Sequence, residues 1–351
     1  MSIDVIGWDI GGAHLKAVAL HDDGRTLARQ EPTPLWQGLD HLHRAIQSII
    51  TAWPESHGCR HGVTMTGELV DLFPNREEGV RALTDALLAH VPAESVSVFA
   101  GEMGFLAPAT ITPDDILRVA SANWLATALF TAARLPDALL IDIGSTTTDL
   151  LLIGKGRPQI RGTTDLDRLR YQELVYTGVV RTSLMAIASQ APWQGEWASL
   201  MAEHFATTAD VYRLTGELPD HADQMPAADG GEKSLIASAR RIARLLGTDA
   251  ETASLAQWQS LARYFRQQQL ETLRRAAHRQ LSCGLADTHR CFVGAGVGRF
   301  LVQELAQQLG YPYRDFLELM PMPHRTQEFD LADCAPAAAV AFLLNTQHAD
   351  R

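Results

Sequence analysis

Two stretches of the sequence place an aspartate at the end of an apolar run and follow it with a turn of small residues. They are "WDIGGAHLKAVAL" at positions 8–20 and "IDIGSTTTDLLLI" at positions 141–153. The aspartates are Asp9 and Asp142, and the turn residues are Gly11, Gly12, Gly144, Ser145, Thr146 and Thr147. Backbone N–H groups in such turns donate to phosphoryl oxygens, and carboxylates hold Mg²⁺ directly or through its waters. The repeat therefore predicts a diphosphate clamp with Asp9 and Asp142 as its metal-binding groups.

Two further features strengthen this prediction. Lys16 follows the first turn at a distance from which its ammonium group can reach the same oxygens. A third glycine-rich turn, "GAGVG", contains Gly294 and Gly296 and opens a helix whose N-terminus favours anions. A single such turn is most often an ordinary glycine hairpin, but two copies and a third turn favour a phosphate site. The third glycine of a dinucleotide fingerprint is absent, so a Rossmann site is not favoured.

The elements that must position these turns alternate between strands and helices. Apolar spacing predicts strands at 4–9, 15–20, 61–65 and 95–100 with helices at 38–53 and 82–90, and one helix running from Pro113 toward Arg134. The pattern begins again at 138 with two strands and a further strand at 158–163. Long helical stretches follow, including 253–283, and a small-residue helix is expected at 335–344. We expect an α/β protein with two duplicated lobes, 1–135 and 136–351, the second with a helical insertion around 185–290.

Composition limits the class of protein. The 351 residues include 46% hydrophobic and 20% charged residues and carry a net charge of −11. This charge has the wrong sign for a nucleic-acid or anionic-membrane partner, and the chain has no run of apolar residues long enough to span a bilayer. The N-terminus lacks a secretory signal, so we expect a cytoplasmic protein. Four widely spaced cysteines fit buried thiols in a reducing compartment.

Several polar residues outside the turns leave two interpretations open. The residues Glu68, Asp71 and Arg76 follow a strand, where loops carry function, but solvated charges with an internal salt bridge are an equal alternative. Arg181 either grips an anion with two donors or forms a structural ion pair. Asp210 and Arg213 are three apart and favour a structural pair on one helix face. The group His57, Cys59 and His61 lacks zinc-ligand spacing and favours a surface loop.

The motifs "DIGGAHLKA", "DIGSTTTDL" and "VGAGVG" resemble the two phosphate motifs and the adenosine motif of the actin, sugar kinase and Hsp70 superfamily. This resemblance implies a ribonuclease H-like fold with a central cleft. The phrases "MTGELVDLFPNREEGV", "YTGVVRTSL" and "FATTADVYRLTGEL" resemble the hydantoinase/oxoprolinase-like family. Within it they are similar to the tetrahydromethanopterin-linked C1-transfer proteins of methylotrophs and their archaeal counterparts in methanofuran biosynthesis.

The resemblance implies a transferase that condenses an aminomethylfuran-methyl diphosphate with the phenol of γ-glutamyltyramine, or of tyrosine, and releases pyrophosphate. Asp9, Asp142, Lys16 and Glu68 would be catalytic, with Asp9 and Asp142 as metal-binding or acid/base groups for Mg²⁺ and diphosphate. One carboxylate of the Glu68 phrase, Glu68 or Asp71, would take the phenol proton. The glycines and hydroxyl residues of the first two turns would bind the diphosphate, together with Arg181. Gly294 and Gly296 would line the pocket that binds the nucleotide in the actin and sugar kinase superfamily. ATP is possible in such a site but not required.

Two other functions remain open. The first is an ATP-dependent small-molecule kinase or a hydantoinase/oxoprolinase-like ATPase, although neither Asp142 nor Asp149 is plainly placed to activate a hydroxyl. The second is a nucleotide-switched regulatory or assembly protein that opens and closes its lobes. The partners expected in the favoured interpretation are small diphosphate and phenolic substrates.

Overall fold

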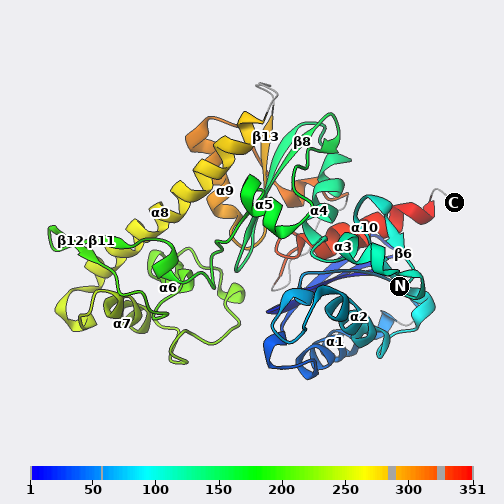
Figure 1. Ribbon diagram of the computed structural model, residues 1–351, viewed down its shortest axis with the longest axis horizontal. Helices are drawn as coiled ribbons and strands as arrows, with labels where there is room; N and C mark the ends of the chain where they lie inside the picture. The colour runs from blue at the N-terminus through cyan, green and yellow to red at the C-terminus, as the bar shows by residue number, and fades with distance from the viewer. Residues whose placement is uncertain (1, 57, 284–289, 322–328, 350–351) are drawn as a thin grey trace. The chain divides into compact units, whose positions relative to one another are not determined.

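The computed structural model describes residues 2–56, 58–283, 290–321 and 329–349 (Figure 1). Contacts group the chain into two compact units, one of residues 1–138, 153–167 and 315–351 and one of residues 139–152 and 168–314. Residues 315–351 join the first unit because helix α10 (Ala335–Ala349) packs against strand β1 (Ile3–Ile10) and helix α4 (Asn123–Ala132). This grouping differs from the continuous C-terminal lobe, 136–351, that the sequence predicted.

The first unit is built on a sheet with the strand order β3-β2-β1-β4-β5-β6. The remaining strands of this sheet are β2 (His14–His21), β3 (Thr26–Pro32), β4 (Arg60–Met65), β5 (Val96–Phe99) and β6 (Phe105–Leu106). Strand β2 pairs antiparallel with both β1 and β3, whereas β4 runs parallel to β1. The predicted strands of this half are confirmed, and β3 and β6 are additions that the sequence pattern did not reveal.

Helices cover both faces of this sheet, which explains why β1 is apolar almost throughout. On one face Trp8 and its neighbours join a core with α1 (Asp40–Ala52) and α2 (Arg76–Leu88). On the other face Gly7 allows α10 to lie directly on the strand, since a methyl group at Gly7 would stand 2.0 Å from the Ala337 carbonyl oxygen. Figure 1 shows α10, in red, crossing the blue sheet on the side opposite α1 and α2.

The single helix predicted from Pro113 to Arg134 is broken into two. Helix α3 (Ile116–Val119) ends before Ser121, whose φ of 51° lies in the left-handed region, and α4 begins at Asn123. The apolar periodicity continues across the break, which is why the pattern suggested one helix. Ser121 therefore lies between the two helices, and Asn123 is the first residue of α4. At these positions the side chains do not have to follow the periodicity of a continuous helix.

The second sheet has the order β10-β8-β7-β13-β14, with β9 paired to β8. Its strands are β7 (Ala138–Ile143), β8 (Thr148–Gly154), β9 (Arg157–Pro158), β10 (Leu174–Val175), β13 (Cys291–Ala295) and β14 (Tyr313–Asp315), accompanied by helices α5 (Asp165–Tyr171) and α9 (Arg299–Leu309). The order β8-β7-β13 matches β2-β1-β4, so the predicted duplication is present in the sheets. The strand expected at 158–163 is shorter than predicted, because only Arg157 and Pro158 pair with β8.

The predicted insertion forms a separate core within the second unit. It contains α6 (Thr208–Thr215), α7 (Leu235–Leu245), the long α8 (Leu255–Ser282) and a hairpin of β11 (Gln190–Trp193) and β12 (Glu196–Ser199). Leu214, Ile242 and Trp258 lie at the centre of this core. The long helix was predicted, whereas the hairpin was not.

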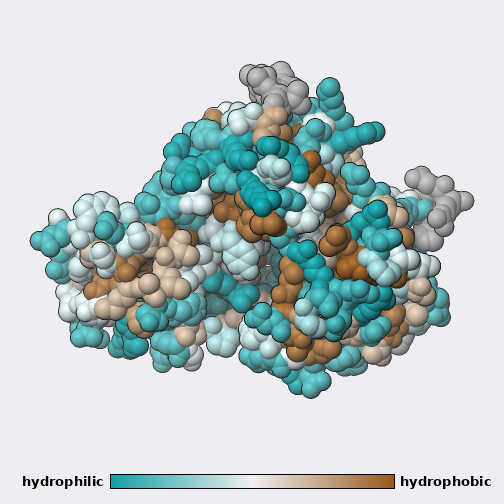
Figure 2. All heavy atoms as spheres, viewed as in Figure 1, coloured by the Kyte–Doolittle hydropathy of each residue, from teal (hydrophilic) through white to brown (hydrophobic). Residues whose placement is uncertain are grey.

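The surface carries both polar and apolar side chains, and Figure 2 shows the two kinds intermingled on one face. The exposed large apolar residues include Trp36, Leu69 and Leu72 of the first unit. Over the ranges of the chain that the structure describes, none of the helices combines the length and apolar character needed to span a bilayer.

Candidate functional site

The first glycine-rich turn joins β1 to β2 and places Asp9 directly opposite Lys16 in the antiparallel ladder. The turn is closed by a hydrogen bond of 3.0 Å from the Gly11 N–H to the His14 carbonyl oxygen. A side chain at Gly11 would approach that oxygen to 2.9 Å, so the turn requires glycine. The Lys16 ammonium donates to the Asp333 carbonyl oxygen at 2.8 Å, just before α10. Asp9 and Lys16 therefore share one face of the sheet beside the turn.

The loop after β4 lies against this first turn and carries Glu68. The Thr66 N–H donates to the Ile10 carbonyl oxygen at 3.0 Å, and a methyl group at Gly67 would stand 3.3 Å from the Gly11 carbonyl carbon. Glu68 is only 1% exposed. Burial raises the pKa of Glu68 from its ordinary 4.5 to about 7, against the lowering effect of a hydrogen bond from Ser121. A carboxyl group that titrates near neutrality is suited to accepting and releasing protons.

The break between α3 and α4 supplies one partner to each of these two carboxylates. The Ser121 hydroxyl donates to Glu68 Oε1 at 2.7 Å, and the Asn123 amide donates to Asp9 Oδ1 at 3.4 Å. The sequence analysis did not select either residue. The pair of cap-forming residue types in "SANW", interrupting an apolar pattern, was the available signal.

The other two charged residues of the Glu68 phrase differ in their surroundings. Arg76 forms an ion pair of 3.1 Å with Asp165 Oδ2, and both side chains are about a quarter exposed. Asp165, which the sequence analysis also passed over, lies 3.3 Å from the Ser121 hydroxyl. Asp71 is exposed. The structure thus connects Glu68 and Arg76 through Ser121 and Asp165.

The second glycine-rich turn joins β7 to β8 in the second unit. The Gly144 N–H donates to the Thr147 carbonyl oxygen at 2.9 Å, which gives the same closure as in the first turn. The Ser145 carbonyl oxygen accepts from the N–H groups of Val180 and Arg181 at 3.0 and 2.8 Å. Residues 178–181 therefore pack against the second turn and stabilise it through backbone hydrogen bonds.

Arg181 also contacts the second turn through its side chain. Its guanidinium group donates to Thr146 Oγ1 at 3.3 Å, and burial lowers its pKa. A methyl group at Gly178 would stand 2.4 Å from the Thr146 N–H nitrogen, so this approach depends on glycine. The structure brings Arg181 to the predicted second turn, where a desolvated cation is suited to binding an anion.

The third glycine-rich turn lies against Asp142. Gly296 has a φ of 76°, and a methyl group there would stand 2.4 Å from Asp142 Oδ1. The Gly298 N–H donates to the Ile143 carbonyl oxygen at 2.9 Å at the start of α9. Gly294 has a different reason to be glycine, because Tyr313 fills the space that a side chain would need. Asp142, the second turn and Gly296 therefore form one cluster at the ends of β7 and β13.

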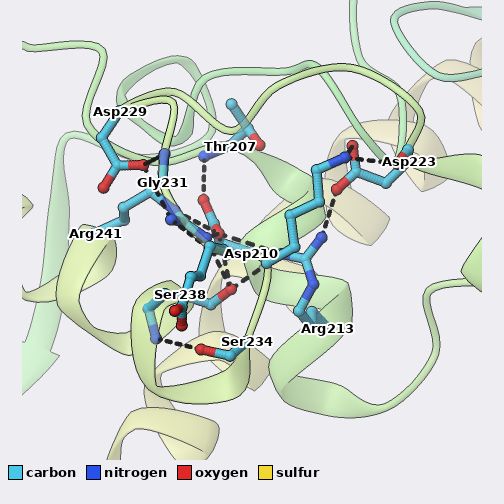
Figure 3. A network of polar contacts seen from close by, with 12 residues as sticks. Thr207, Asp210, Arg213, Asp223, Asp229, Gly231, Ser234, Ser238 and Arg241 are labelled. Carbon is cyan, nitrogen blue, oxygen red and sulfur yellow. Dashed lines mark hydrogen bonds and ion pairs between the residues drawn. The ribbon is translucent and has the colours of Figure 1, made fainter.

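The remaining polar residues of the second unit serve its structure. Asp210 and Arg213 form the predicted pair, and both belong to a network centred on the fully buried Arg241 (Figure 3). Arg241 Nε donates to Asp210 at 2.8 Å, while its Nη1 donates to Asp229 at 3.1 Å. Asp149 is paired with the buried Arg168. The network around Arg241 holds α6, α7 and the loop before α7 together, whereas the Asp149–Arg168 pair joins β8 to α5.

The surface loop predicted for the histidine and cysteine group is not what the structure shows. Cys59 and His61 are buried, because His61 lies on β4 and accepts a hydrogen bond of 3.1 Å from the Trp8 indole. Burial lowers the pKa of His61 to about 4, which keeps the ring neutral. His57 lies outside the described residues. Within those residues no three potential metal-ligating side chains come together.

The fold and the duplicated strand–turn–strand units define an α/β protein of the type found in actin-like ATPases and sugar kinases. A nucleotide-free acetone carboxylase structure, from work on ATP-dependent acetone carboxylation, matches with a TM-score of 0.57 at 11% identity and covers 88% of this chain and 68% of that one. The family model for hydantoinase/oxoprolinase matches residues 60–316. This chain belongs to the hydantoinase/oxoprolinase family.

Two curated relatives carry the same name, (4-{4-[2-(γ-L-glutamylamino)ethyl]phenoxymethyl}furan-2-yl)methanamine synthase. The protein from Methanocaldococcus jannaschii is 31% identical over 252 residues, which cover 72% of this chain and 74% of the relative. The protein from Methanococcus vannielii is 30% identical over 118 residues, which cover 34% of this chain and 53% of the relative.

Proposed function

We propose that this protein forms the aryl ether of a methanofuran-type one-carbon carrier, linked to tetrahydromethanopterin-dependent metabolism. The observation that carries the proposal is the 31% identity, over most of both chains, to a synthase whose name describes a phenoxymethyl group on a furan. In the proposed reaction the methylene carbon of an aminomethylfuran-methyl diphosphate leaves pyrophosphate and bonds to the phenol oxygen of γ-glutamyltyramine or tyrosine. The phenol proton passes to a base on the protein.

We assign Glu68 as that base. The burial that raises its pKa to about 7 makes it a stronger proton acceptor than an ordinary carboxylate. Glu68 Oε2 is buried and has no hydrogen-bond partner among the residues that the structure describes, so it has the capacity to accept a proton. Asp9 and Lys16 belong to the same unit, and the loop that carries Glu68 lies against the turn between them.

In each unit, taken by itself, phosphate-binding groups are assigned to its glycine-rich turn. In the first unit these groups are Gly11, Gly12 and Lys16, and in the second they are Gly144, Ser145, Thr146, Thr147 and Arg181. Asp9 and Asp142 each supply a single carboxylate beside a turn, which suits Mg²⁺, because this ion binds through one or two carboxylates together with substrate phosphates. When bound, Mg²⁺ would neutralise charge that develops on the pyrophosphate.

An exposed apolar group beside the first turn suits the aromatic rings of the substrates. Leu69 follows Glu68 directly, and Leu72 lies three positions further along the chain. The Leu35 N–H donates to the Gly12 carbonyl oxygen at 3.1 Å, which brings the neighbouring Trp36 to the same turn. Aromatic and leucine side chains that remain exposed next to polar groups are typical of small-molecule sites.

The third turn keeps an ATP-dependent reaction as the second candidate. Gly296 approaches Asp142 closely and opens α9, an arrangement suited to a nucleotide as well as to a diphosphate. In this alternative the protein is a small-molecule kinase, an ATPase of its family or a nucleotide-operated switch.

The deciding experiment incubates the purified protein with Mg²⁺, the furan diphosphate and either phenolic acceptor, with and without ATP. Pyrophosphate release and the product mass are measured. We expect an ether product without ATP, and Glu68→Gln should remove it, whereas Glu55→Gln, an exposed charge removed elsewhere in the same unit, should not. No ether with any acceptor, accompanied by ATP turnover or tight ATP binding, refutes the proposal in favour of the second candidate.

A further inference from the structure

A chain of polar contacts in the first unit runs from the buried Glu68 to Asp165 and Arg76. The Ser121 hydroxyl lies 2.7 Å from Glu68 Oε1 and 3.3 Å from Asp165 Oδ2, and Asp165 Oδ2 accepts from Arg76 at 3.1 Å. Exposure increases along this chain. Glu68 is 1% exposed, while the side chains of Asp165 and Arg76 are 22% and 28% exposed. The chain therefore connects a buried carboxyl group with solvent.

The single proton of the serine hydroxyl gives this chain two states. A hydroxyl donates one hydrogen bond and accepts others. When Glu68 is ionised, Ser121 donates to Glu68. When Glu68 is protonated, its O–H donates to the Ser121 oxygen, and the Ser121 hydroxyl turns to donate to Asp165. The Ser121 hydroxyl is therefore within hydrogen-bond distance of both the group that would give the proton, Glu68, and the group that would receive it, Asp165.

The backbone at Ser121 makes glycine a suitable test of the hydroxyl group. Its φ of 51° is a conformation that glycine adopts at little cost and that other residues adopt with strain. Unlike glycine, serine places a hydroxyl group here within hydrogen-bond distance of two carboxylates. Replacing it by glycine therefore removes the hydroxyl group and leaves the backbone conformation available.

We propose that Ser121 is a proton-relay residue that carries the phenol proton from Glu68 to Asp165, from which it is lost to water. The inference rests on the proposed function. In the first step the acceptor O–H bond breaks and Glu68 becomes a neutral acid. In the second, the Glu68 carboxyl group rotates so that its O–H faces Ser121 and gives the proton to the Ser121 oxygen, while the Ser121 hydroxyl proton moves to Asp165. Arg76 favours the ionised form of Asp165, so the proton is released from Asp165 to water, which restores all three groups.

The test compares Ser121→Gly, which suits the backbone but lacks the hydroxyl, with Asp165→Asn and with the double variant. Lys155→Gly is the matched control, because Lys155 has a φ of 54° in the same unit and lies in an exposed turn. We expect each single variant to lower kcat by at least about tenfold with little change in KM, and the control to match wild type. Since both residues serve one relay, the double variant should be no slower than the slower single variant. Losses that multiply in the double variant overturn the relay.

A second measurement does not depend on turnover. The titration of Glu68 is followed by ¹³C NMR of protein labelled in its glutamate carboxyl groups, with Glu68→Gln identifying the signal. Besides burial, the groups acting on Glu68 are the Ser121 hydroxyl, Asp165 and Arg76. Ser121→Gly should raise the pKa of Glu68 because the ionised form loses a donor, and Asp165→Asn should lower it because a negative neighbour is removed.

The two measurements separate the two proposals. Wild-type protein that forms no ether overturns the proposed function, and the relay with it, whatever the NMR shows. An active wild-type enzyme whose Glu68 titration is unchanged in both variants overturns the relay alone.

Discussion

Replacing Glu68 by glutamine should make the protein more stable at neutral and alkaline pH while removing its activity. Burial raises the pKa of Glu68 from 4.5 to about 7, so the folded state binds the proton more tightly than the unfolded state does. The stabilising contribution of this proton is complete below pH 4.5 and is lost as the pH rises through 7. Each tenfold change in proton affinity is worth about 1.4 kcal/mol, which gives a total of about 3 kcal/mol. Glutamine has no charge to bury and still accepts the Ser121 hydrogen bond.

The assay is urea unfolding followed by tryptophan fluorescence, for which Trp8 and Trp53 are buried probes in the same unit. The quantity of interest is the difference in unfolding free energy between Glu68→Gln and wild type at a series of pH values. We expect this difference to increase by about 3 kcal/mol in favour of the variant between pH 4.5 and pH 8. Glu55→Gln controls for the removal of one negative charge. If the difference in unfolding free energy stays constant with pH, or falls, then ionisation of Glu68 does not destabilise the folded state and the reasoning is refuted.

Three further predictions concern other parts of the molecule. Asp9→Asn and Asp142→Asn should each abolish turnover with an unchanged circular dichroism spectrum, and wild-type rates in both would remove them from the mechanism. Gly296→Ala should lower the free energy of unfolding, because its methyl group would stand 2.4 Å from Asp142 Oδ1, whereas Gly144→Ala, with its nearest contact at 3.5 Å, should leave that free energy close to wild type; equal losses in the two variants would contradict this. Arg241→Met should destabilise the protein by about 3 kcal/mol in unfolding experiments, since it leaves the buried Asp210 with the more distant Arg213 as its cation; a change below about 1 kcal/mol would mean that the network is dispensable.

The strand–turn–strand units could be predicted from sequence because their signals are local. An apolar run, an aspartate and glycines recur within a few residues, and the same spacing fixes the pairing of Asp9 with Lys16 across the hairpin. The long helix α8 was likewise predicted from its periodicity. In each of these elements the residues that define the structure are neighbours in the chain.

The residues around Glu68 could not be found in this way, because their contacts connect distant parts of the sequence. Asp165 reaches Arg76 across 89 positions, and Ser121 reaches Glu68 across 53. Nothing in a local pattern specifies such partners. Ser121 was hidden further by the apolar periodicity that continues from α3 into α4. The burial of His61 was missed for a similar reason. The strand at 61–65 was predicted, but its position between β1 and β5 in the sheet depends on residues that are distant in the sequence.

The packing of α10 on β1 has a consequence for biosynthesis. Residues 3–10 are synthesised long before residues 335–349, which form the helix that covers one face of their strand. At synthesis rates of about 5–20 residues per second, the apolar face around Gly7 waits tens of seconds for its partner. The first unit therefore completes its folding only after translation has passed residue 349, and in the meantime its nascent sheet is a natural client for chaperones.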